Sequence, residues 1–440
     1  MGKTIIVAGL GHGGIAAAAQ LAKSGFDVTV YEKCAEGTLG YDWTDIFAPS
    51  SLETAGMSMP PEDKFEYKED MTFFGPTSTK SLRQHVPKDE LEIKMERKDI
   101  YTHFIEHAVN CGVKIVYECE VFGPIILGNR VVGIKTEKGD FYADLVIDAC
   151  GMNSPVRRNL PDFMGIEKEV AREEKITIYR AFYNKASDEE VDAKFKVMLF
   201  KYGVKGISWV ASEDEYTDVL LGRFDDFDLE EVERLNALLR EENPRLGTER
   251  VRGGRFVDIP VRHALSVMVA NGYAAIGDSA FMPVPLIGSG IANALKASRI
   301  LADTVKADKD CEFTAETLWA YQYNFFKTVG ASLAPLECAK YLLLKLTPEE
   351  IDYCFDSGML SDDNVTMSAT FDGIGDIMKA DPKDLINKAK TVCKDPTLLK
   401  KIVSCGASMG KVSAACAMIP KKWNKDRVFA WAKVYGYSFK

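Results

Sequence analysis

Residues 4–14 read TIIVAGLGHGG, and an alanine-rich run to residue 22 and the segment DVTVYE at 27–32 follow them. A strand, a G-x-G-x-x-G loop, a helix and a second strand in this order predict a dinucleotide-binding βαβ unit. Gly9 permits the tight turn, Gly11 lets the backbone approach a pyrophosphate, and Gly14 lets the helix pack on the sheet. Glu32, which ends the second strand, is then expected to hold ribose hydroxyls.

The composition is that of a globular protein. The chain has 440 residues, enough for two or three domains, of which 46% are hydrophobic and 27% charged. Its net charge of −10 argues against electrostatic attraction to a nucleic acid or to an anionic membrane surface. The ten cysteines form no C-x-x-C pair or zinc-like spacing, which favours reduced thiols in the cytoplasm. No apolar run reaches the length of a membrane span, although contact with a membrane surface stays open.

The pattern along the chain predicts three parts. A discontinuous dinucleotide-binding domain is expected at 1–172 and 263–310, a sheet domain at 173–262 and a helical region at 311–440. In the first part we predict a helix at 98–109 and a small sheet from strands at 113–117, 121–127, 130–136 and 141–147. In the second we predict strands at 176–183, 195–201, 206–211 and 217–224, and a helix at 229–242.

Three later segments add to the first motif. The segment ACGMNSPVR at 149–157 follows a strand, and Ser154 and Arg157 are expected to brace its turn. The segment GYAAIGDSA at 272–280 places Asp278 at a strand end, where a carboxylate can bind ribose or ribityl hydroxyls. PLIGSGI at 285–291 opens a long helix, whose N-terminal amides can face an electron-rich ring edge.

Together these segments resemble the flavoprotein group that includes para-hydroxybenzoate hydroxylase and, more closely, the geranylgeranyl reductases. The resemblance implies FAD as the cofactor and an α/β fold: a Rossmann-like FAD-binding domain, an antiparallel-sheet substrate domain and a helical C-terminal region. The expected FAD contacts are Gly9, Gly11, Gly13, Gly14, Glu32, Lys33, Arg97, Gly151, Gly277, Asp278, Gly288, Ser289, Gly290 and Ile291.

Two departures bear on the substrate. The family usually has Asp-Gly where this chain has Cys150-Gly151, so the role of that aspartate does not carry over. The isoprenoid reductases have an aromatic-x-Trp-x-Phe-Pro stretch that lines a lipid pocket, whereas residues 207–212 read ISWVAS and keep only the tryptophan. A substrate that is smaller or more polar than a geranylgeranyl chain is therefore at least as consistent with the sequence as a lipid is. The expected substrate contacts are Trp209, Tyr41, Trp43 and Pro285, with local packing as the alternative for the aromatic residues.

Several residues have simpler interpretations. His103 and His107 fit an H-x-x-E-H pattern, but no third ligand is evident and we expect no metal site. We expect His12 to point to solvent. Cys34 and Cys150 lie near the expected cofactor, and we interpret them as small buried hydrophobic residues rather than redox groups.

We therefore predict an FAD-dependent oxidoreductase. The reaction that we favour is the reduction of a carbon-carbon double bond of a small or lipid-like substrate by hydride transfer from flavin N5. The alternatives are a flavin monooxygenase that hydroxylates an aromatic substrate and a flavin electron-transfer protein that acts with a redox partner. The electron donor is NAD(P)H or a redox protein. No catalytic acid or base stands out in the sequence.

Overall fold

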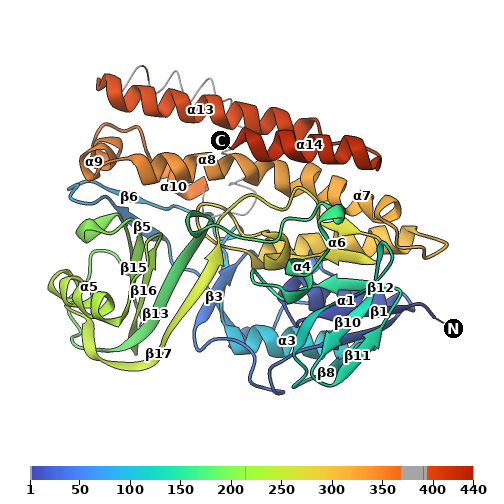
Figure 1. Ribbon diagram of the computed structural model, residues 1–440. Helices are drawn as coiled ribbons and strands as arrows, with labels where there is room; N and C mark the ends of the chain where they lie inside the picture. The colour runs from blue at the N-terminus through green and yellow to red at the C-terminus, as the bar shows by residue number, and fades with distance from the viewer. Residues whose placement is uncertain (1, 214, 368–389, 391–393, 440) are drawn as a thin grey trace.

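The computed structural model describes residues 2–213, 215–367, 390 and 394–439. Its first layer is a six-stranded sheet in the order β18-β19-β12-β1-β2-β8, parallel except for the β18–β19 pair. The strands are β1 (Thr4–Ala8), β2 (Asp27–Tyr31), β8 (Lys114–Val116), β12 (Leu145–Asp148), β18 (Val269–Ala270) and β19 (Tyr273–Ala275). Helix α1 (His12–Lys23) packs on this sheet, between α3 (Arg97–Asn110) and α6 (Ile291–Ala307) (Figure 1). The predicted Rossmann-like topology is confirmed.

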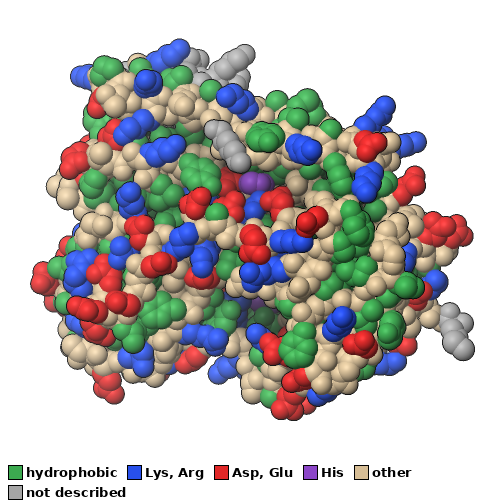
Figure 2. Space-filling view, in the orientation of Figure 1, with side chains coloured by type: hydrophobic (Ala, Val, Ile, Leu, Met, Phe, Trp, Pro, Cys, Tyr) green, Lys and Arg blue, Asp and Glu red, His purple; other side chains and the backbone are tan. Residues whose placement is uncertain are grey.

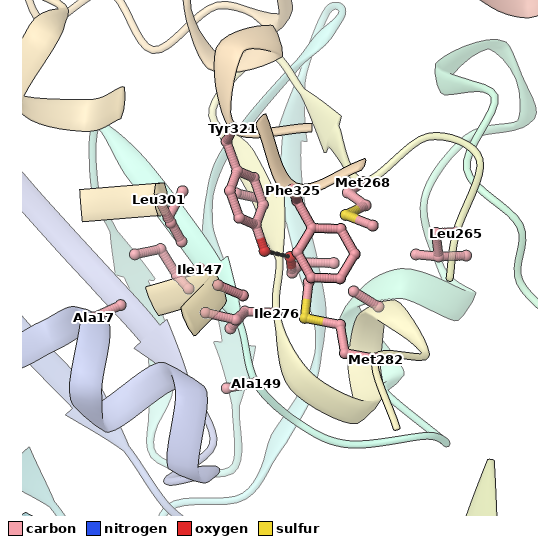
Figure 3. Packing of buried hydrophobic residues seen from close by; sticks show 14 of the residues in the cluster. Ala17, Ile147, Ala149, Leu265, Met268, Ile276, Met282, Leu301, Tyr321 and Phe325 are labelled. Atoms are coloured by element: carbon pink, nitrogen blue, oxygen red, sulfur yellow. Dashed lines mark hydrogen bonds between the residues drawn. The ribbon is translucent and has the colours of Figure 1, made fainter. Parts of the chain in front are cut away.

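Small side chains allow this layer to pack closely. Residues 16–19 of α1 are four fully buried alanines, which bring α1 close to α6. Across that contact Gln20 Nε2 donates to Ser298 Oγ at 3.0 Å. From the other side the hydroxyl of Tyr321, on α7 (Ala315–Phe325), donates to the Ala275 carbonyl at 2.9 Å (Figure 3). One hydrophobic core therefore joins the parallel sheet to the helices that follow it in the chain.

The second layer is a seven-stranded sheet in the order β17-β13-β16-β15-β14-β5-β6, in which only the β14–β5 pair is parallel. Its strands are β5 (Met71–Phe74), β6 (Ser81–Arg83), β13 (Lys175–Lys185), β14 (Phe195–Leu199), β15 (Gly206–Ser212), β16 (Tyr216–Arg223) and β17 (Leu246–Pro260). The four predicted strands and the helix, α5 (Leu229–Glu242), are confirmed with small shifts at their ends. Because β5 and β6 precede residue 173, the seven-stranded sheet includes residues from outside the predicted sheet domain at 173–262. The division into domains stays a prediction.

Two short sheets complete the β structure. One has the order β11-β10-β9, from β9 (Val121–Leu127), β10 (Arg130–Thr136) and β11 (Gly139–Tyr142); the other has the order β3-β7-β4, from β3 (Thr44–Phe47), β4 (Phe65–Tyr67) and β7 (Ile93–Glu96). The single strand predicted at 141–147 is wrong, because the chain leaves the short sheet after Tyr142. Asp144 accepts the Thr4 amide at 2.9 Å, and β12 then pairs with β1. The strand predicted at 113–117 also lies elsewhere, as β8 of the parallel sheet.

Most of the described residues beyond Thr314 are helical, as predicted. After α7 come a π-helical turn (Phe326–Gly330), α8 (Ala331–Lys345), α9 (Pro348–Asp356), α10 (Asp362–Met367), α13 (Pro396–Ala417) and α14 (Lys425–Ser438); two short helices, α2 (Ser50–Thr54) and α4 (Pro155–Arg158), lie earlier. Helices α13 and α14 form the outermost layer over α8 (Figure 1). Among the described helices, none is both long and apolar enough to cross a bilayer.

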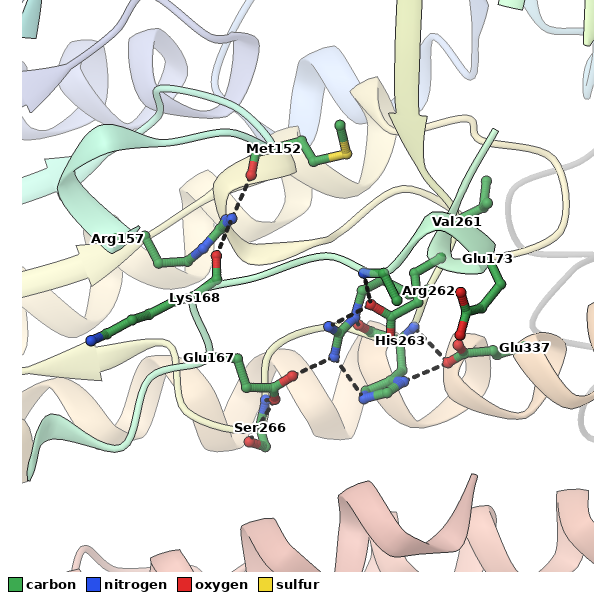
Figure 4. Close-up of polar contacts among 12 residues, drawn as sticks. Met152, Arg157, Glu167, Lys168, Glu173, Val261, Arg262, His263, Ser266 and Glu337 are labelled. Carbon is green, nitrogen blue, oxygen red and sulfur yellow. Dashed lines mark hydrogen bonds and ion pairs between the residues drawn. The ribbon is translucent and has the colours of Figure 1, made fainter. Parts of the chain in front are cut away.

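A charge network joins α8 to the rest of the protein; it is made of the half-buried Glu167 and the buried Arg262, His263, Glu337 and Lys340 (Figure 4). Arg262 Nη2 lies 2.5 Å from a Glu167 oxygen, and His263 Nδ1 lies 2.5 Å from Glu337 Oε2. Lys340 Nζ donates to the carbonyl oxygen of Val261 at 2.6 Å. Glu337 and Lys340 have almost no exposed surface, so their charges are compensated inside the protein rather than by water.

Candidate functional site

The glycine loop after β1 is shaped by close contact with the end of β12. Gly9 has φ +84°, and a Cβ there would lie 2.7 Å from the Ala149 carbonyl oxygen. A Cβ on Gly14 would lie 2.4 Å from the Ala149 side chain. Gly11 is the N-cap of α1, and no side chain in the described part of the chain caps that helix end. The first amides of α1 therefore remain available to an anion such as a pyrophosphate.

Glu32 holds this loop against the chain that follows β2. Its side chain is buried, and its two carboxylate oxygens accept the amides of Leu10 at 2.8 Å and Cys34 at 2.9 Å. Each oxygen keeps a second lone pair, so the carboxylate can still accept a ribose hydroxyl. The neighbouring Lys33 is exposed. The predicted acidic residue therefore lies beside the predicted glycine loop.

The prediction that His12 points to solvent is wrong. Its ring stacks on Tyr101 with a centroid distance of 4.7 Å and contacts the edge of Phe104. Burial, together with the nearby charge of Arg97, lowers the pKa of His12 to about 3, so the ring is neutral at physiological pH. Its Nε2 is buried and has no hydrogen-bond partner among the described residues. The glycine loop thus presents an unsatisfied polar atom next to the start of α1.

Arg97 lies between the loop after β2 and the 272–280 segment that carries Asp278. It opens α3, lies 3.2 Å from Asp45 and places its guanidinium 4.5 Å from the centre of the Tyr41 ring. Burial would lower the pKa of Arg97, but Asp45 and neighbouring groups including Asp278 raise it, so it remains a permanent cation. Burial raises the pKa of Asp278, and the charge of Arg97 partly offsets that rise. The structure therefore brings two predicted cofactor contacts, Arg97 and Asp278, into one electrostatic environment.

Asp148 is a buried residue of the site that the sequence analysis did not select. It ends β12 and accepts hydrogen bonds from the hydroxyls of Ser154 at 2.6 Å, Tyr273 at 2.9 Å and Ser279 at 3.1 Å. Ser279 Oγ in turn accepts the amide of Gly151 at 2.8 Å. The carboxylate therefore ties the turn after β12 to the Gly277–Ala280 turn. Its position two residues before Cys150-Gly151, at a strand end, is the signal that could have identified it.

Arg157 and Ser154 brace the turn after β12, as predicted. The Ser154 hydroxyl accepts the Arg157 amide at 3.1 Å and caps α4. The guanidinium of Arg157 is fully buried and donates to the Ser279 carbonyl at 2.7 Å. It also lies 4.3 Å from the centre of the Phe281 ring. These contacts hold the 277–280 turn in place.

A second helix N-terminus faces the same region. Gly290 is the N-cap of α6, which begins at Ile291, and no described side chain caps it. Gly288, two residues earlier, lies so close to β17 that a Cβ there would be 3.2 Å from Ile259. The 285–291 loop, which is expected to face the flavin ring, therefore contacts the seven-stranded sheet. Pro285 instead lines a small cavity with Phe325 and is turned toward the helical region.

The face of the seven-stranded sheet beside this loop carries an aromatic cluster. Tyr41, Trp43 and Trp209 belong to one hydrophobic cluster that also contains Ile259. Arg180 is buried between the two tryptophans, with its guanidinium 5.0 Å from the Trp209 ring, and it pairs with buried Asp218. We call Tyr41, Trp43, Trp209 and Ile259 the aromatic wall. Three of the four predicted substrate contacts therefore lie together.

The remaining sequence candidates lie in ordinary packing environments. His103 and His107 are half-buried on α3, and a ring nitrogen of His103 lies 2.9 Å from the Ser58 carbonyl. No group of three or more acidic, histidine or cysteine side chains suited to a metal occurs in the part of the chain that the structure describes. Burial raises the pKa of Cys34 and raises that of Cys150 well above its usual value, which keeps both thiols protonated.

Comparison with known proteins supports the resemblance. No protein-family model matches the chain. It is 22% identical over 435 residues to the digeranylgeranylglycerophospholipid reductase of Sulfolobus acidocaldarius, covering 95% of this chain and 93% of the relative. It is 27% identical over 326 residues to the reductase of the same name from Haloferax volcanii, covering 68% and 75%.

Solved structures share the fold. A geranylgeranyl bacteriochlorophyll reductase-like protein from Thermoplasma acidophilum superimposes with a TM-score of 0.73 at 18% identity, covering 89% of this chain and all of that chain. A myxobacterial FAD-dependent halogenase has a TM-score of 0.61 at 17% identity, covering 86% and 95%. The 2-methyl-3-hydroxypyridine-5-carboxylic acid oxygenase has 0.57 at 17%, covering 78% and 93%. The predicted fold class is confirmed, and the resemblance to the geranylgeranyl reductases is confirmed as a similarity.

Proposed function

We propose that this chain binds FAD and reduces a carbon-carbon double bond of a lipid-like, isoprenoid substrate. The observation that carries the proposal is the meeting of two uncapped helix N-termini, those of α1 and α6, with the aromatic wall. The first helix end suits a pyrophosphate and the second suits the electron-rich edge of a flavin. The names of the relatives, which are reductases of a geranylgeranyl lipid, support the substrate class.

The residues of the site fit FAD. The Gly9–Gly14 loop and the first turn of α1 would receive the pyrophosphate, where His12 Nε2 offers a buried polar atom without a partner among the described residues. Glu32 would hold the adenosine ribose, and Asp278, with Arg97 nearby, would hold the ribityl side. Residues 288–291 would face the ring. Reduced FAD bound here supplies a hydride from N5.

The protein's own contribution to reduction is to orient the substrate and exclude water. The aromatic wall offers flat apolar surface to an alkene chain, and such surface favours apolar ligands over water. The ion pair of Arg180 with Asp218 fixes the two tryptophans from inside the sheet, since Arg180 also donates to the Thr44 carbonyl beside Trp43. A wall held in this way presents a constant surface to the ring.

The test is a single-turnover experiment. The protein is reconstituted with FAD, reduced with dithionite without oxygen and mixed with a glycerolipid that carries geranylgeranyl chains. We expect the flavin to reoxidise and the lipid to gain two mass units per reduced double bond. Trp209→Leu should slow reoxidation more than tenfold with unchanged FAD affinity. The matched control is Phe256→Leu, because Phe256 packs on the opposite, α5-covered face of the sheet.

Two outcomes contradict the proposal. If the lipid leaves the reduced flavin unchanged, while oxygen yields an aromatic product heavier by one oxygen atom, the chain is a monooxygenase. If no small substrate reoxidises the flavin but a redox protein does so with saturation, it is an electron-transfer protein. The physiological donor, NAD(P)H or a redox protein, is identified by which of them reduces the bound flavin.

A further inference from the structure

The outermost helices, α13 and α14, have a solvent-exposed face that is richer in basic residues than the chain as a whole. Val428, Trp431 and Tyr435 of α14 are buried at helical spacing. The opposite side of the same helix carries Arg427 and Lys433, which are exposed. One side of α14 is therefore fixed by packing, and the other is turned outward (Figure 1).

That outer face is strongly basic. Between residues 411 and 437 the sequence has six lysines and arginines and one acidic residue, Asp426, although the whole chain carries −10. The cations are Lys411, Lys421, Lys422, Lys425, Arg427 and Lys433, and all six are exposed. Lys425 lies over the rings of Phe163 and Phe429, and none of the six forms an ion pair with a described carboxylate. Lysine and arginine side chains project along the upper edge of the molecule in Figure 2.

Apolar side chains protrude between these cations. Met418 is 60% exposed, Val434 49% and Tyr437 69%, and Phe163, from the loop beneath α14, is 48% exposed. Exposed apolar and aromatic side chains beside lysines and arginines can enter the boundary between headgroups and acyl chains, as those of interfacial helices do. A protein partner would more typically meet a continuous apolar centre with a polar rim.

We infer that the C-terminal half of α13, the 418–422 segment and α14 form a docking surface for a membrane that contains anionic phospholipids. The lysines and arginines would lie among the phosphates, and Met418, Val434 and Tyr437 would enter the boundary between headgroups and chains. Each basic side chain near such a surface strengthens binding several-fold. The rest of the chain is more acidic than the net charge indicates, so repulsion favours contact through this face.

This inference does not depend on the proposed substrate, so its test uses lipids without isoprenoid double bonds. The full-length protein is sedimented with vesicles of phosphatidylcholine alone and of phosphatidylcholine with one-third phosphatidylglycerol. We expect binding to the anionic vesicles only, and we expect it to weaken as salt rises. The variant Lys421→Gln/Lys422→Gln/Lys433→Gln should lower the partition coefficient about 100-fold, at roughly fivefold for each lysine.

Two further variants complete the design. Met418→Ser/Tyr437→Ser should weaken binding at high salt, where the electrostatic contribution is screened. The matched control is Lys88→Gln/Lys205→Gln/Lys309→Gln, three exposed lysines outside this surface, and it should bind as the wild type does. Circular dichroism checks that each variant is folded. Equal binding to neutral and anionic vesicles, or equal loss in the control variant, would overturn the inference. So would full retention of vesicle binding by the first variant, since the basic side chains would then not contact the lipid.

Discussion

The carboxylate of Glu337 is the most informative group to perturb, because it is the centre of the charge network. It lies 2.5 Å from His263 Nδ1, accepts the His263 amide at 2.9 Å and lies 3.7 Å from Lys340 Nζ. Glu337→Gln keeps the shape but leaves the buried Lys340 without its carboxylate. Removing one member of a buried pair costs about 3–5 kcal/mol.

The pKa of Glu337 gives a second route to the magnitude. Burial would raise this pKa, but His263 and Lys340 outweigh burial and lower it from 4.5 to about 2. A fall of that size corresponds to about 3 kcal/mol of stability. Because the folded pKa is the lower one, this stability is complete above pH 4.5 and is lost as the pH falls toward 2. We therefore expect Glu337→Gln to lower the free energy of unfolding by about 3 kcal/mol at pH 7, and by much less at pH 2.5.

Urea unfolding followed by tryptophan fluorescence measures this difference, since Trp431 lies next to Tyr435, whose ring contacts His263. The control is Asp303→Asn, which removes an acid from an exposed surface cluster on α6 and should change stability by less than about 0.5 kcal/mol. A loss below 1 kcal/mol for Glu337→Gln at pH 7, or a loss that is the same at pH 2.5, would refute the reasoning.

Three further outcomes are expected. Gly14→Ala should abolish retention of FAD during purification, because its Cβ would lie 2.4 Å from the side chain of Ala149 and α1 would have to shift. His12 should stay neutral from pH 5 to 9, and its ring signals in two-dimensional NMR should not titrate there; a midpoint near 6.5 would contradict its burial against Tyr101. Asp148→Asn should lower the free energy of unfolding by about 2 kcal/mol, because an amide NH₂ cannot accept from the hydroxyls it would face, and a urea midpoint equal to that of the wild type would count against this role.

The elements that the sequence predicted best are those fixed by local pattern. The strand, glycine loop and helix at 4–23 and helix α3 follow from periodicity and glycine spacing over short stretches of chain. Glu32 and Asp278 were selected as cofactor contacts because each ends or follows a strand at a distance that the motif sets, and their roles stay predictions. What these predictions share is that no pairing between distant segments is needed to make them.

The residues that were missed depend on long-range contacts. His12 was expected in solvent, but Tyr101 of α3 comes to lie over it only after α1 and α3 pack. Asp148 was not selected, because its partners Tyr273 and Ser279 are more than 120 residues away in the sequence. The pairing of β5 with β14 joins two short strands that lie more than 120 residues apart in the sequence. Periodicity contains no information about such pairings.

The hydrogen bonds from the amides of Leu10 and Cys34 to Glu32 have a consequence for ligand capture. They hold the loop after β1 in its bent form with protein atoms alone, and the Gly9 amide adds a third bond to the Tyr31 carbonyl at 2.8 Å. The chain has therefore already lost its conformational freedom there before any cofactor arrives. Association then requires no ordering of the loop, so the cofactor's binding free energy is not reduced by a folding step, and a preorganised cradle of this kind retains its ligand through a slow dissociation rate.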